Sequence, residues 1–411
     1  MVACPDARPP AYQAAVGFAN AGQLDRLVTG YYRKDHRVLE SLARAAAPHA
    51  WPHIQKRLAR RHADGVPSNL VRAHPSFDMA LAVENRAPHR LRSRIAQART
   101  ERFDRDVSRA LAKNHPDQAL IFSDVGSEHA LPYCREAGIR TILSMVHGDV
   151  REEAEVLARE QATSPDFFPM YLADGPIDAK SLAWLHERRL RDLEFADMIA
   201  VPSEHIALRL RMHGIAADRI AVIPYAADTR RFVPKQEKAF DSRCRFLFAG
   251  GITQRKGIKY LLEAWRKIRR PDWSLGLLGG LPRESAPLEP YRDDVEFLGR
   301  VGHSDMPARL ASADVFVFPS LFEGSAVVTY EAMACGLPSI VTAESGSVAR
   351  DGIEGVIVPS ANVDVLAASM ERLGNDPELR EHMSLAARLR SEEFDWFRYH
   401  ASLVGLVDRA F

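Results

Sequence analysis

Two glutamates, Glu323 and Glu331, flank the start of an expected helix in the C-terminal half of the chain. The helix directly follows an apolar run at 315–318 that is typical of a buried strand. Free backbone N–H groups and the helix dipole make such a strand-to-helix turn a suitable site for a phosphate. The amides that we expect to hold this phosphate belong to three small residues, Gly324, Ser325 and Ala326.

The spacing of the two carboxylates fits a nucleotide diphosphate. Glu331 lies about 9 Å along the helix axis from the helix start, which is roughly the distance from a diphosphate to its ribose. Its carboxylate can accept hydrogen bonds from two ribose hydroxyls, while Glu323 lies on the sugar side of the phosphate. Spacing alone leaves open the alternative that both are surface acids of an ordinary turn and helix.

A second strand-to-helix turn supplies glycines and cations. Gly250 and Gly251 follow the apolar run 245–249 and open space at the edge of the sheet. Arg255 and Lys256 place two positive charges at the same turn, and these charges can neutralise a diphosphate as its bond to sugar breaks. For Lys256 taken alone, the alternative is a solvated lysine at a helix start.

Strands and helices alternate along most of the chain, which predicts an α/β protein with parallel sheets. Apolar runs indicate the strands, which we expect at 2–4, 24–29, 119–122, 140–146, 197–202, 220–223, 245–249, 274–278, 295–298, 315–318, 338–342 and 355–358. The segment 257–269 has apolar residues at helical spacing, so it is expected to pack on a sheet. The basic segments 33–62 and 86–105 are expected to be surface helices.

The length of 411 residues predicts two domains. Prolines and a polar stretch at 224–243 mark the boundary between them. We therefore expect an N-terminal Rossmann-like domain at 1–224, a linker at 225–243, a C-terminal Rossmann-like domain at 244–393, and a final helix at 394–411 that can return to the first domain.

Composition argues against several classes of protein. Hydrophobic residues make up 46% of the chain and charged residues 27%, as in globular proteins. The net charge of +1 gives no reason to expect nucleic-acid binding. The four cysteines lie far apart, which indicates a reducing cytoplasm rather than a disulfide framework or a zinc site. The N-terminus lacks the apolar stretch of a signal peptide, and no apolar run approaches the roughly 18 residues of a spanning helix.

Taken together, the motifs resemble glycosyltransferase family 4. The resemblance rests on the E-x7-E segment at 323–331, the G-G-x-x-x-R-K-G run at 250–257, and three further stretches at 223–228, 295–299 and 313–320. It implies the GT-B fold, in which two Rossmann-like domains enclose a ligand cleft. It also implies a retaining, metal-independent transfer of sugar from a nucleotide donor held by the C-terminal domain.

The resemblance implies roles for individual residues. Glu331 would hold the donor ribose, and Glu323 would contact the transferred sugar. Lys256 and the amides after Gly324 would bind the diphosphate. The residues expected beside the base are Arg300 and Val301.

The chain departs from the family pattern at two places around the phosphate. Family members usually have an arginine where this chain has Gly251, and Arg255 is the candidate to replace it. Their Gly-Phe-Gly sequence after the first glutamate is Gly-Ser-Ala at 324–326, which still places small residues toward the phosphate.

On the acceptor side, His147 directly follows the expected strand 140–146, and family members often carry a histidine there near the reacting sugar. A histidine at a strand end can equally be a structural capping residue. Further acceptor-side candidates are Asp149, Asp124 and Glu128. The Gly-rich loop that many relatives have near the N-terminus is replaced here by the proline-rich stretch 5–10. We therefore expect the catalytic residues to be Glu323, His147 and Lys256.

The expected activity is transfer of a hexose from a nucleotide sugar to a glycan or lipid-linked acceptor, in the biosynthesis of surface polysaccharides or glycoconjugates. Departing phosphate would take the acceptor proton, and no metal or other cofactor is expected. The expected location is the cytoplasm. There the basic stretches 56–62 and 86–94, with Trp51, could rest on the inner face of an anionic membrane or form solvated helix faces.

Two other functions stay open. One is a non-catalytic GT-B scaffold that binds glycans or partner proteins. The other is an NAD-dependent enzyme on a doubly wound sheet. That enzyme needs a G-x-G-x-x-G motif after the first strand, and none is present at 1–30.

Overall fold

The structure is a computed structural model that describes residues 1–6, 8–33, 41, 44–45, 49, 61–172, 179–236 and 241–409. The expected surface helix at 33–62 lies mostly outside the described residues, as do Trp51 and the basic residues 56–60. Within them, no helix is both long and apolar enough to cross a bilayer.

The N-terminal domain is built on a parallel sheet with the strand order β3-β2-β1-β4-β5-β6-β7. Its strands are β1 (Val2–Ala3), β2 (Leu27–Thr29), β3 (Val71–Ala73), β4 (Gln118–Phe122), β5 (Arg140–Ser144), β6 (Met198–Val201) and β7 (Ile220–Val222). Six of these seven strands lie within the apolar runs that predicted them, except that β4 begins one residue earlier than its run. The exception is β3, which was not predicted. The three residues of β3 were missed because Val-Arg-Ala has no apolar run to distinguish it from a loop.

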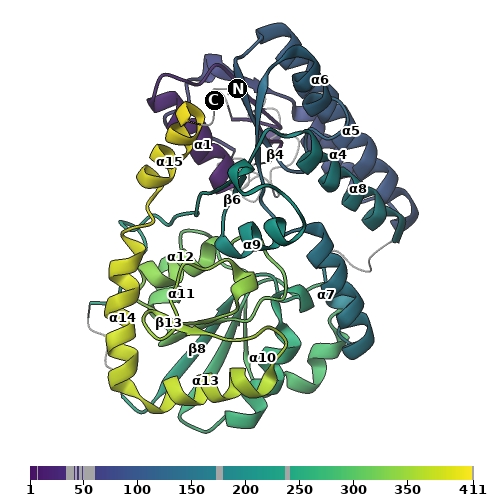
Figure 1. Ribbon diagram of the computed structural model, residues 1–411. Helices are drawn as coiled ribbons and strands as arrows, with labels where there is room; N and C mark the ends of the chain where they lie inside the picture. Colours follow the sequence, from purple (N-terminus) through teal and green to yellow (C-terminus); the bar gives the residue numbers. More distant parts are fainter. Residues whose placement is uncertain are drawn as a thin grey trace.

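Helices cover both faces of this sheet (Figure 1). They are α1 (Pro9–Asn20), α4 (Pro75–Glu84), α5 (His89–Asn114), α6 (Ala130–Ala137), α7 (Val150–Thr163), α8 (Ala179–Phe195) and α9 (Glu204–Met212), with short 3₁₀ turns η1 (Ser68–Leu70), η2 (Phe168–Met170) and η3 (Ala217–Arg219). The basic segment predicted at 86–105 forms most of α5, which continues to Asn114.

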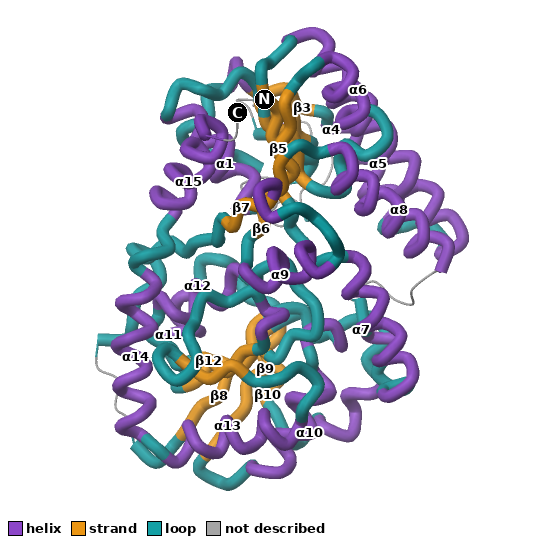
Figure 2. The backbone as a smooth tube through the Cα atoms, viewed as in Figure 1, coloured by secondary structure: helices purple, strands orange, loops and turns teal. Residues whose placement is uncertain are grey.

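The C-terminal domain has a second parallel sheet, in the order β10-β9-β8-β11-β12-β13 (Figure 2). Its strands are β8 (Cys244–Ala249), β9 (Trp273–Leu278), β10 (Glu296–Gly299), β11 (Val315–Phe318), β12 (Ser339–Val341) and β13 (Gly355–Ile357). Its helices are α10 (Ile258–Ile268), α11 (Met306–Ala311), α12 (Val327–Ala334), α13 (Val363–Asn375) and α14 (Pro377–Ser391), with η4 (Gln254–Lys256), η5 (Ala286–Tyr291) and η6 (Ala343–Ser345).

Two segments cross between the domains. The final helix, α15 (Trp396–Arg409), lies against α1 of the N-terminal domain, where the Tyr399 hydroxyl donates to the carbonyl of Pro10 at 3.2 Å (Figure 1). Helix α7 belongs to the N-terminal half of the sequence, but the carboxylate of its buried Glu160 accepts hydrogen bonds from Gln254 (2.6 Å) and Tyr260 (2.9 Å) of the C-terminal domain. The chain therefore joins the domains by more than the linker expected at 225–243.

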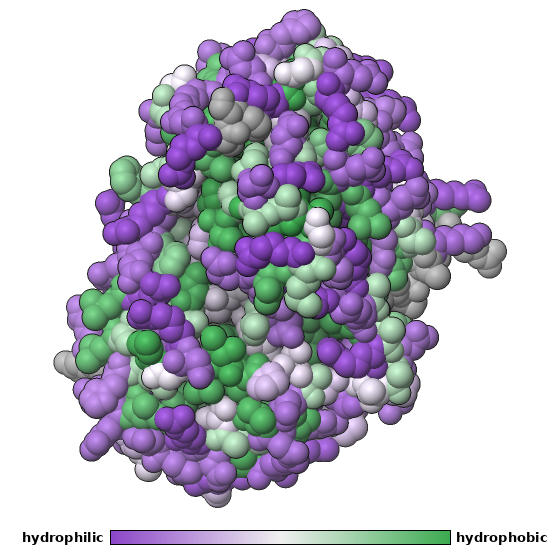
Figure 3. Space-filling model, viewed as in Figure 1, coloured by the Kyte–Doolittle hydropathy of each residue, from purple (hydrophilic) through white to green (hydrophobic). Residues whose placement is uncertain are grey.

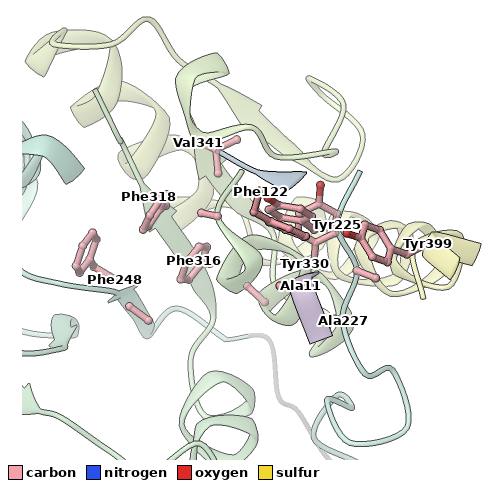
Figure 4. Close-up of a cluster of buried hydrophobic side chains, with 14 of the residues drawn as sticks. Ala11, Phe122, Tyr225, Ala227, Phe248, Phe316, Phe318, Tyr330, Val341 and Tyr399 are labelled. Carbon is pink, nitrogen blue, oxygen red and sulfur yellow. The ribbon is translucent and has the colours of Figure 1, made fainter. Parts of the chain in front are cut away.

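Apolar side chains fill both domains and continue across the boundary between them. Phe248, Phe316 and Phe318 stack along the C-terminal sheet with ring centroids 5.6 and 5.9 Å apart (Figure 4). Elsewhere in the same group of buried side chains, Tyr225 and Tyr399 meet edge to face at 6.3 Å. On the surface, hydrophobic residues appear in patches between hydrophilic ones, more over the middle of the visible face than at its top (Figure 3). These buried side chains fix the two sheets, and therefore also the loops that follow their strands at the domain boundary.

Candidate active site

A cavity of about 540 Å³ lies at the carboxyl edge of the C-terminal sheet, where β8, β9 and β11 end. Open parallel sheets bind ligands at this edge. The predicted residues that line it are Gly250, Gly251, Lys256, Arg300, Val301, Glu323, Ser325 and Ala326. Arg255, Gly324 and Glu331 are not part of its lining.

Glycines make the floor of this cavity. A Cβ on Gly279 would lie 1.7 Å from the carbonyl oxygen of Gly250, and one on Gly280 would lie 2.0 Å from Nε of Arg300. Any side chain at these positions would therefore collide with the backbone or displace the arginine. The sequence reasoning missed this pair, although Gly-Gly directly after the buried strand β9 repeats the signal that was used after β8.

Glu323 stands between two cations on the cavity wall. Its Oε1 accepts from Arg255 at 2.9 Å, and its Oε2 is in close contact with Nζ of Lys256. The Lys256 ammonium also lies 5.1 Å from the centroid of the Phe318 ring. Burial and the Arg255 cation lower the pKa of Lys256, while the Glu323 carboxylate opposes this shift by stabilising the ammonium. Because two cations face one carboxylate, this group of side chains has a net positive charge, which favours an anionic ligand.

Arg255, the candidate to replace the family arginine at Gly251, is not among the residues that line the cavity. Its guanidinium donates to Glu323, and its backbone N–H donates to the carbonyl of Tyr171 at 3.3 Å. The arginine that does line the cavity is Arg300, packed against Gly280.

The turn before α12 differs from the prediction. The helix begins at Val327, and the N–H of Ala326 donates to the carbonyl of Ser345 at 3.0 Å, so this amide is not free for a phosphate. Ser325 Oγ donates to the carbonyl of Gly346 at 2.7 Å. Helix geometry leaves the N–H groups of Val327 and Val328 without an intrahelical acceptor, and both residues line the cavity. Of the three predicted amides, that of Ala326 is therefore occupied, and the amides of Val327 and Val328 are further candidates to bind an anion.

Gly324 also has a different place from the expected one. A Cβ there would lie 2.2 Å from the carbonyl oxygen of Val146, and its own carbonyl accepts from Ser203 at 3.1 Å. A Cβ on Gly148 would lie 2.4 Å from the Phe322 ring. The two glycines let the loop after β5 touch the loop after β11, so that the N-terminal domain closes one side of the site.

Glu331 lies one helical turn beyond Val327, with 8% of its surface exposed. Burial raises the pKa of its carboxyl to about 7, and the Arg231 cation only partly opposes this shift. Among the described residues, no side chain makes a hydrogen bond or ion pair with this carboxylate. A buried acid without a partner is costly in a protein unless a ligand supplies the donors.

On the acceptor side, His147 and Asp124 come together. His147 is 9% exposed, and its Nε2 lies 3.4 Å from Oδ1 of Asp124, which also bonds to Arg189 at 2.9 Å. Burial alone would raise the pKa of Asp124, but Arg189 and His147 outweigh it and hold this pKa well below its usual range. The pair is thus an imidazole beside a fixed carboxylate, next to the loop that carries Glu323.

Asp149 and Glu128 are structural. Asp149 is fully buried and caps α7, where Oδ1 accepts from the N–H of Arg151 at 2.9 Å while Oδ2 contacts His213 at 2.9 Å. Glu128 pairs with the buried Arg188 at 3.0 Å. Both carboxylates therefore have partners within the N-terminal domain.

The chain resembles known glycosyltransferases in sequence and in fold. Residues 243–376 match the family described as glycosyl transferases group 1. The seven- and six-stranded sheets of the described residues form the GT-B fold. Over 99% of this chain and 98% of the other, the structure resembles sucrose-phosphate synthase from Thermosynechococcus elongatus, with a TM-score of 0.68 and 18% identity.

Particular relatives are similar over part of the chain. D-inositol 3-phosphate glycosyltransferase of Pseudarthrobacter chlorophenolicus is 31% identical over 241 residues, which are 51% of this chain and 56% of the relative. MMP alpha-(1->4)-mannosyltransferase of Mycolicibacterium hassiacum is 29% identical over 53% of this chain and 55% of its own length. The match thus spans about half the length of these curated relatives. Anabaena HepE, solved in complex with UDP-glucose, shares the fold with a TM-score of 0.62 and 14% identity over 99% of this chain and 98% of its own.

Proposed function

We propose that this protein is a hexosyltransferase that moves a sugar from a nucleotide donor to an acceptor hydroxyl with retention of configuration, in polysaccharide or glycoconjugate biosynthesis. The observation that carries the proposal is the position of Glu323 and Lys256. Both lie on the wall of the 540 Å³ cavity, at the point where the loop bearing His147 touches the C-terminal domain. Related proteins named as glycosyltransferases, and a fold shared with a UDP-glucose complex, support it.

The residues divide the work along the donor. The amides of Val327 and Val328, with Lys256, bind the diphosphate at the start of α12 and neutralise its growing charge. Glu331, one turn further, accepts hydrogen bonds from the ribose hydroxyls. Arg300 borders the base. These groups hold the donor without a metal ion or other cofactor.

Glu323 and His147 face the reacting sugar from the two domains. Glu323, held by two cations, fixes the orientation of the transferred sugar. His147 orients the acceptor hydroxyl, and its own ring is positioned by Asp124. The oxygen of the departing phosphate accepts the acceptor proton, so that the new bond forms on the face that the leaving group vacates. Holding both reactants in this geometry supplies much of the rate enhancement.

The test begins with thermal melting of the purified chain against nucleoside diphosphates and their sugars, because ligand binding raises the melting temperature. We expect a shift with one base, followed by transfer or slow hydrolysis of the matching sugar. Donor binding without any turnover, with every acceptor offered, would favour the non-catalytic scaffold. A shift with NAD(H) alone would favour the alternative of an NAD-dependent enzyme.

We also propose that the protein works in the cytoplasm and touches an anionic membrane through α4 and the start of α5. Met79 and Val83 on α4 are 68% and 59% exposed, and Leu91 on α5 is 47% exposed, three residues before the exposed Arg94. Apolar and basic side chains on one face are typical of interfacial helices. Sedimentation with phosphatidylglycerol vesicles, reduced in Met79→Asp, supports this contact, and equal sedimentation with neutral vesicles contradicts it.

A further inference from the structure

A second and larger cavity, of about 600 Å³, lies in the N-terminal domain between α4, α5 and α8. Its size falls within the range of about 300–1,000 Å³ that small-molecule sites occupy. Phe122 and Asp124, at the end of β4, form one end of it, and Arg283 of the C-terminal domain borders it as well. The cavity thus opens at the boundary between the domains.

The walls of this cavity are mainly apolar. Phe77 and Phe103 line it from one side and Leu182 and Leu185 from the other. The part of α5 that lines the cavity carries small residues, among them Ala96, as well as the longer side chains of Gln97 and Phe103. A molecule that fills this space must itself be apolar to match the walls.

The aromatic rings offer little open surface for stacking a sugar ring. Phe103 and Phe122 are 3% and 1% exposed. The guanidinium of Arg99 lies 4.3 Å from the centroid of Phe77, and that of Arg188 lies 4.9 Å from Trp184. The walls therefore suit an aliphatic chain better than the flat face of a carbohydrate.

Arginines give the rim of the cavity a positive charge. Arg8 pairs with Asp6 at 2.7 Å, and Arg99 pairs with Glu84 at 3.0 Å. In the part of the chain that the structure describes, Arg92 and Arg283 line the cavity without a carboxylate partner. Arginine is well suited to bind a phosphate with two parallel hydrogen bonds.

Asp124 connects this cavity to the candidate active site. It lines the cavity and lies 3.4 Å from His147, whose neighbour Gly148 touches the loop of Glu323. A molecule bound in the cavity therefore ends beside the groups that would act on an acceptor hydroxyl.

We propose that the acceptor is an amphiphile with an aliphatic chain and a phosphate. The chain packs between α5 and α8, the phosphate binds at Arg92 and Arg283, and the hydroxyl to be glycosylated lies at the Asp124 end. That this ligand is the acceptor of the reaction rests on the proposed transferase function. The chemistry of the ligand, an aliphatic chain with a phosphate, stands on the cavity alone.

The test measures binding of butyl, hexyl and octyl phosphate by calorimetry, with inorganic phosphate, octyl glucoside and maltohexaose as comparison ligands. Each CH₂ that enters the cavity is expected to tighten binding about fourfold, which corresponds to ~0.8 kcal/mol. Octyl glucoside is expected to bind at least about tenfold more weakly than octyl phosphate, because it lacks the charge-assisted bonds.

Two pairs of variants on α5 locate the binding. Ala96→Phe fills the cavity and is expected to abolish the dependence on chain length, whereas Ala112→Phe, on the exposed end of the same helix, retains it. Arg92→Gln is expected to remove the preference for phosphate, and Arg94→Gln, which does not line the cavity, to preserve it.

The proposal is overturned if affinity does not change with chain length, if Ala96→Phe binds octyl phosphate as the unchanged protein does, or if maltohexaose binds in its place. Melting shifts with nucleotide sugars, measured on the same samples, separate this outcome from failure of the transferase proposal. If nucleotide sugars still raise the melting temperature of Ala96→Phe, its donor site is intact, and any loss of alkyl phosphate binding in this variant arises in the second cavity. If alkyl phosphates bind but no nucleotide sugar raises the melting temperature, the transferase function is contradicted, and the proposal that the cavity binds an aliphatic chain with a phosphate is retained.

Discussion

Replacing Glu331 by glutamine is expected to make the ligand-free protein more stable at alkaline pH and the donor complex weaker. Burial raises the pKa of Glu331 from 4.5 to about 7. The folded protein therefore holds this proton more tightly than the unfolded chain. The carboxyl costs nothing below pH 4.5, and its ionisation reduces the free energy of unfolding progressively between that pH and about pH 7.

The magnitude follows from the shift of the pKa. A change of about 2.5 units corresponds to ~3 kcal/mol at pH 8 and to less than ~1 kcal/mol at pH 5. Glu331→Gln removes the titrating group, so the variant should exceed the unchanged protein in stability by these amounts. Urea unfolding of both proteins at pH 5 and pH 8 measures the difference, in which the other titrating groups cancel.

Donor binding should respond in the opposite direction. Ribose hydroxyls bond most strongly to the ionised carboxylate, so the affinity of the unchanged protein for the nucleotide should rise between pH 6 and pH 8. Loss of these bonds in Glu331→Gln should weaken binding by roughly tenfold to a hundredfold at pH 8. If the difference in free energy of unfolding between Glu331→Gln and the unchanged protein is no larger at pH 8 than at pH 5, the carboxylate of Glu331 is not buried without a partner. Unchanged donor affinity would refute its contact with the ribose.

Three further substitutions test other parts of the structure. Lys256→Ala is expected to lower kcat by about 10²–10³-fold in a transfer assay, because it removes a cation from the leaving diphosphate, and a loss seen only in acceptor KM would contradict this role. Gly324→Ala places a Cβ 2.2 Å from the Val146 carbonyl, so kcat should fall by up to about 100-fold while donor affinity is retained; Gly405→Ala, with its nearest neighbour 3.8 Å away, should leave both unchanged. Glu160→Ala leaves Tyr260 and Gln254 without their acceptor and should reduce the free energy of unfolding by about 2 kcal/mol, whereas Glu155→Ala, at a 63% exposed side chain, should change it by no more than about 0.5 kcal/mol.

The sequence predicted the parts of the molecule that depend on local pattern. Buried parallel strands are continuous apolar runs, and such runs located β4 to β13 and the loops that follow them. Because the carboxyl ends of neighbouring strands meet at one edge, the glycines after β8 and the residues after β11 could be assigned to a common cavity.

The parts that depend on contacts distant in sequence could not be predicted. Nothing around Gly324 indicates that Val146 lies against it, and nothing around Asp149 indicates that His213 contacts its carboxylate. The amide of Ala326 was wrongly predicted to be free, because its bond to Ser345 depends on how η6 packs beside α12. An acid beside a predicted cleft cannot be distinguished from a structural cap without knowing its partners.

The position of His147 depends on both domains. In the sequence, His147 lies between β5, which belongs to the N-terminal sheet, and α7, which contacts both domains. The first half of α7 contacts the N-terminal domain through the pair of Glu152 with His205 at 2.7 Å, and its second half contacts the C-terminal domain through Glu160. A change in the angle between the domains therefore acts directly on the short segment 145–149. Since the same segment touches Gly324 beside the 540 Å³ cavity, we expect the imidazole to align with a bound donor only when the two domains are closed against each other.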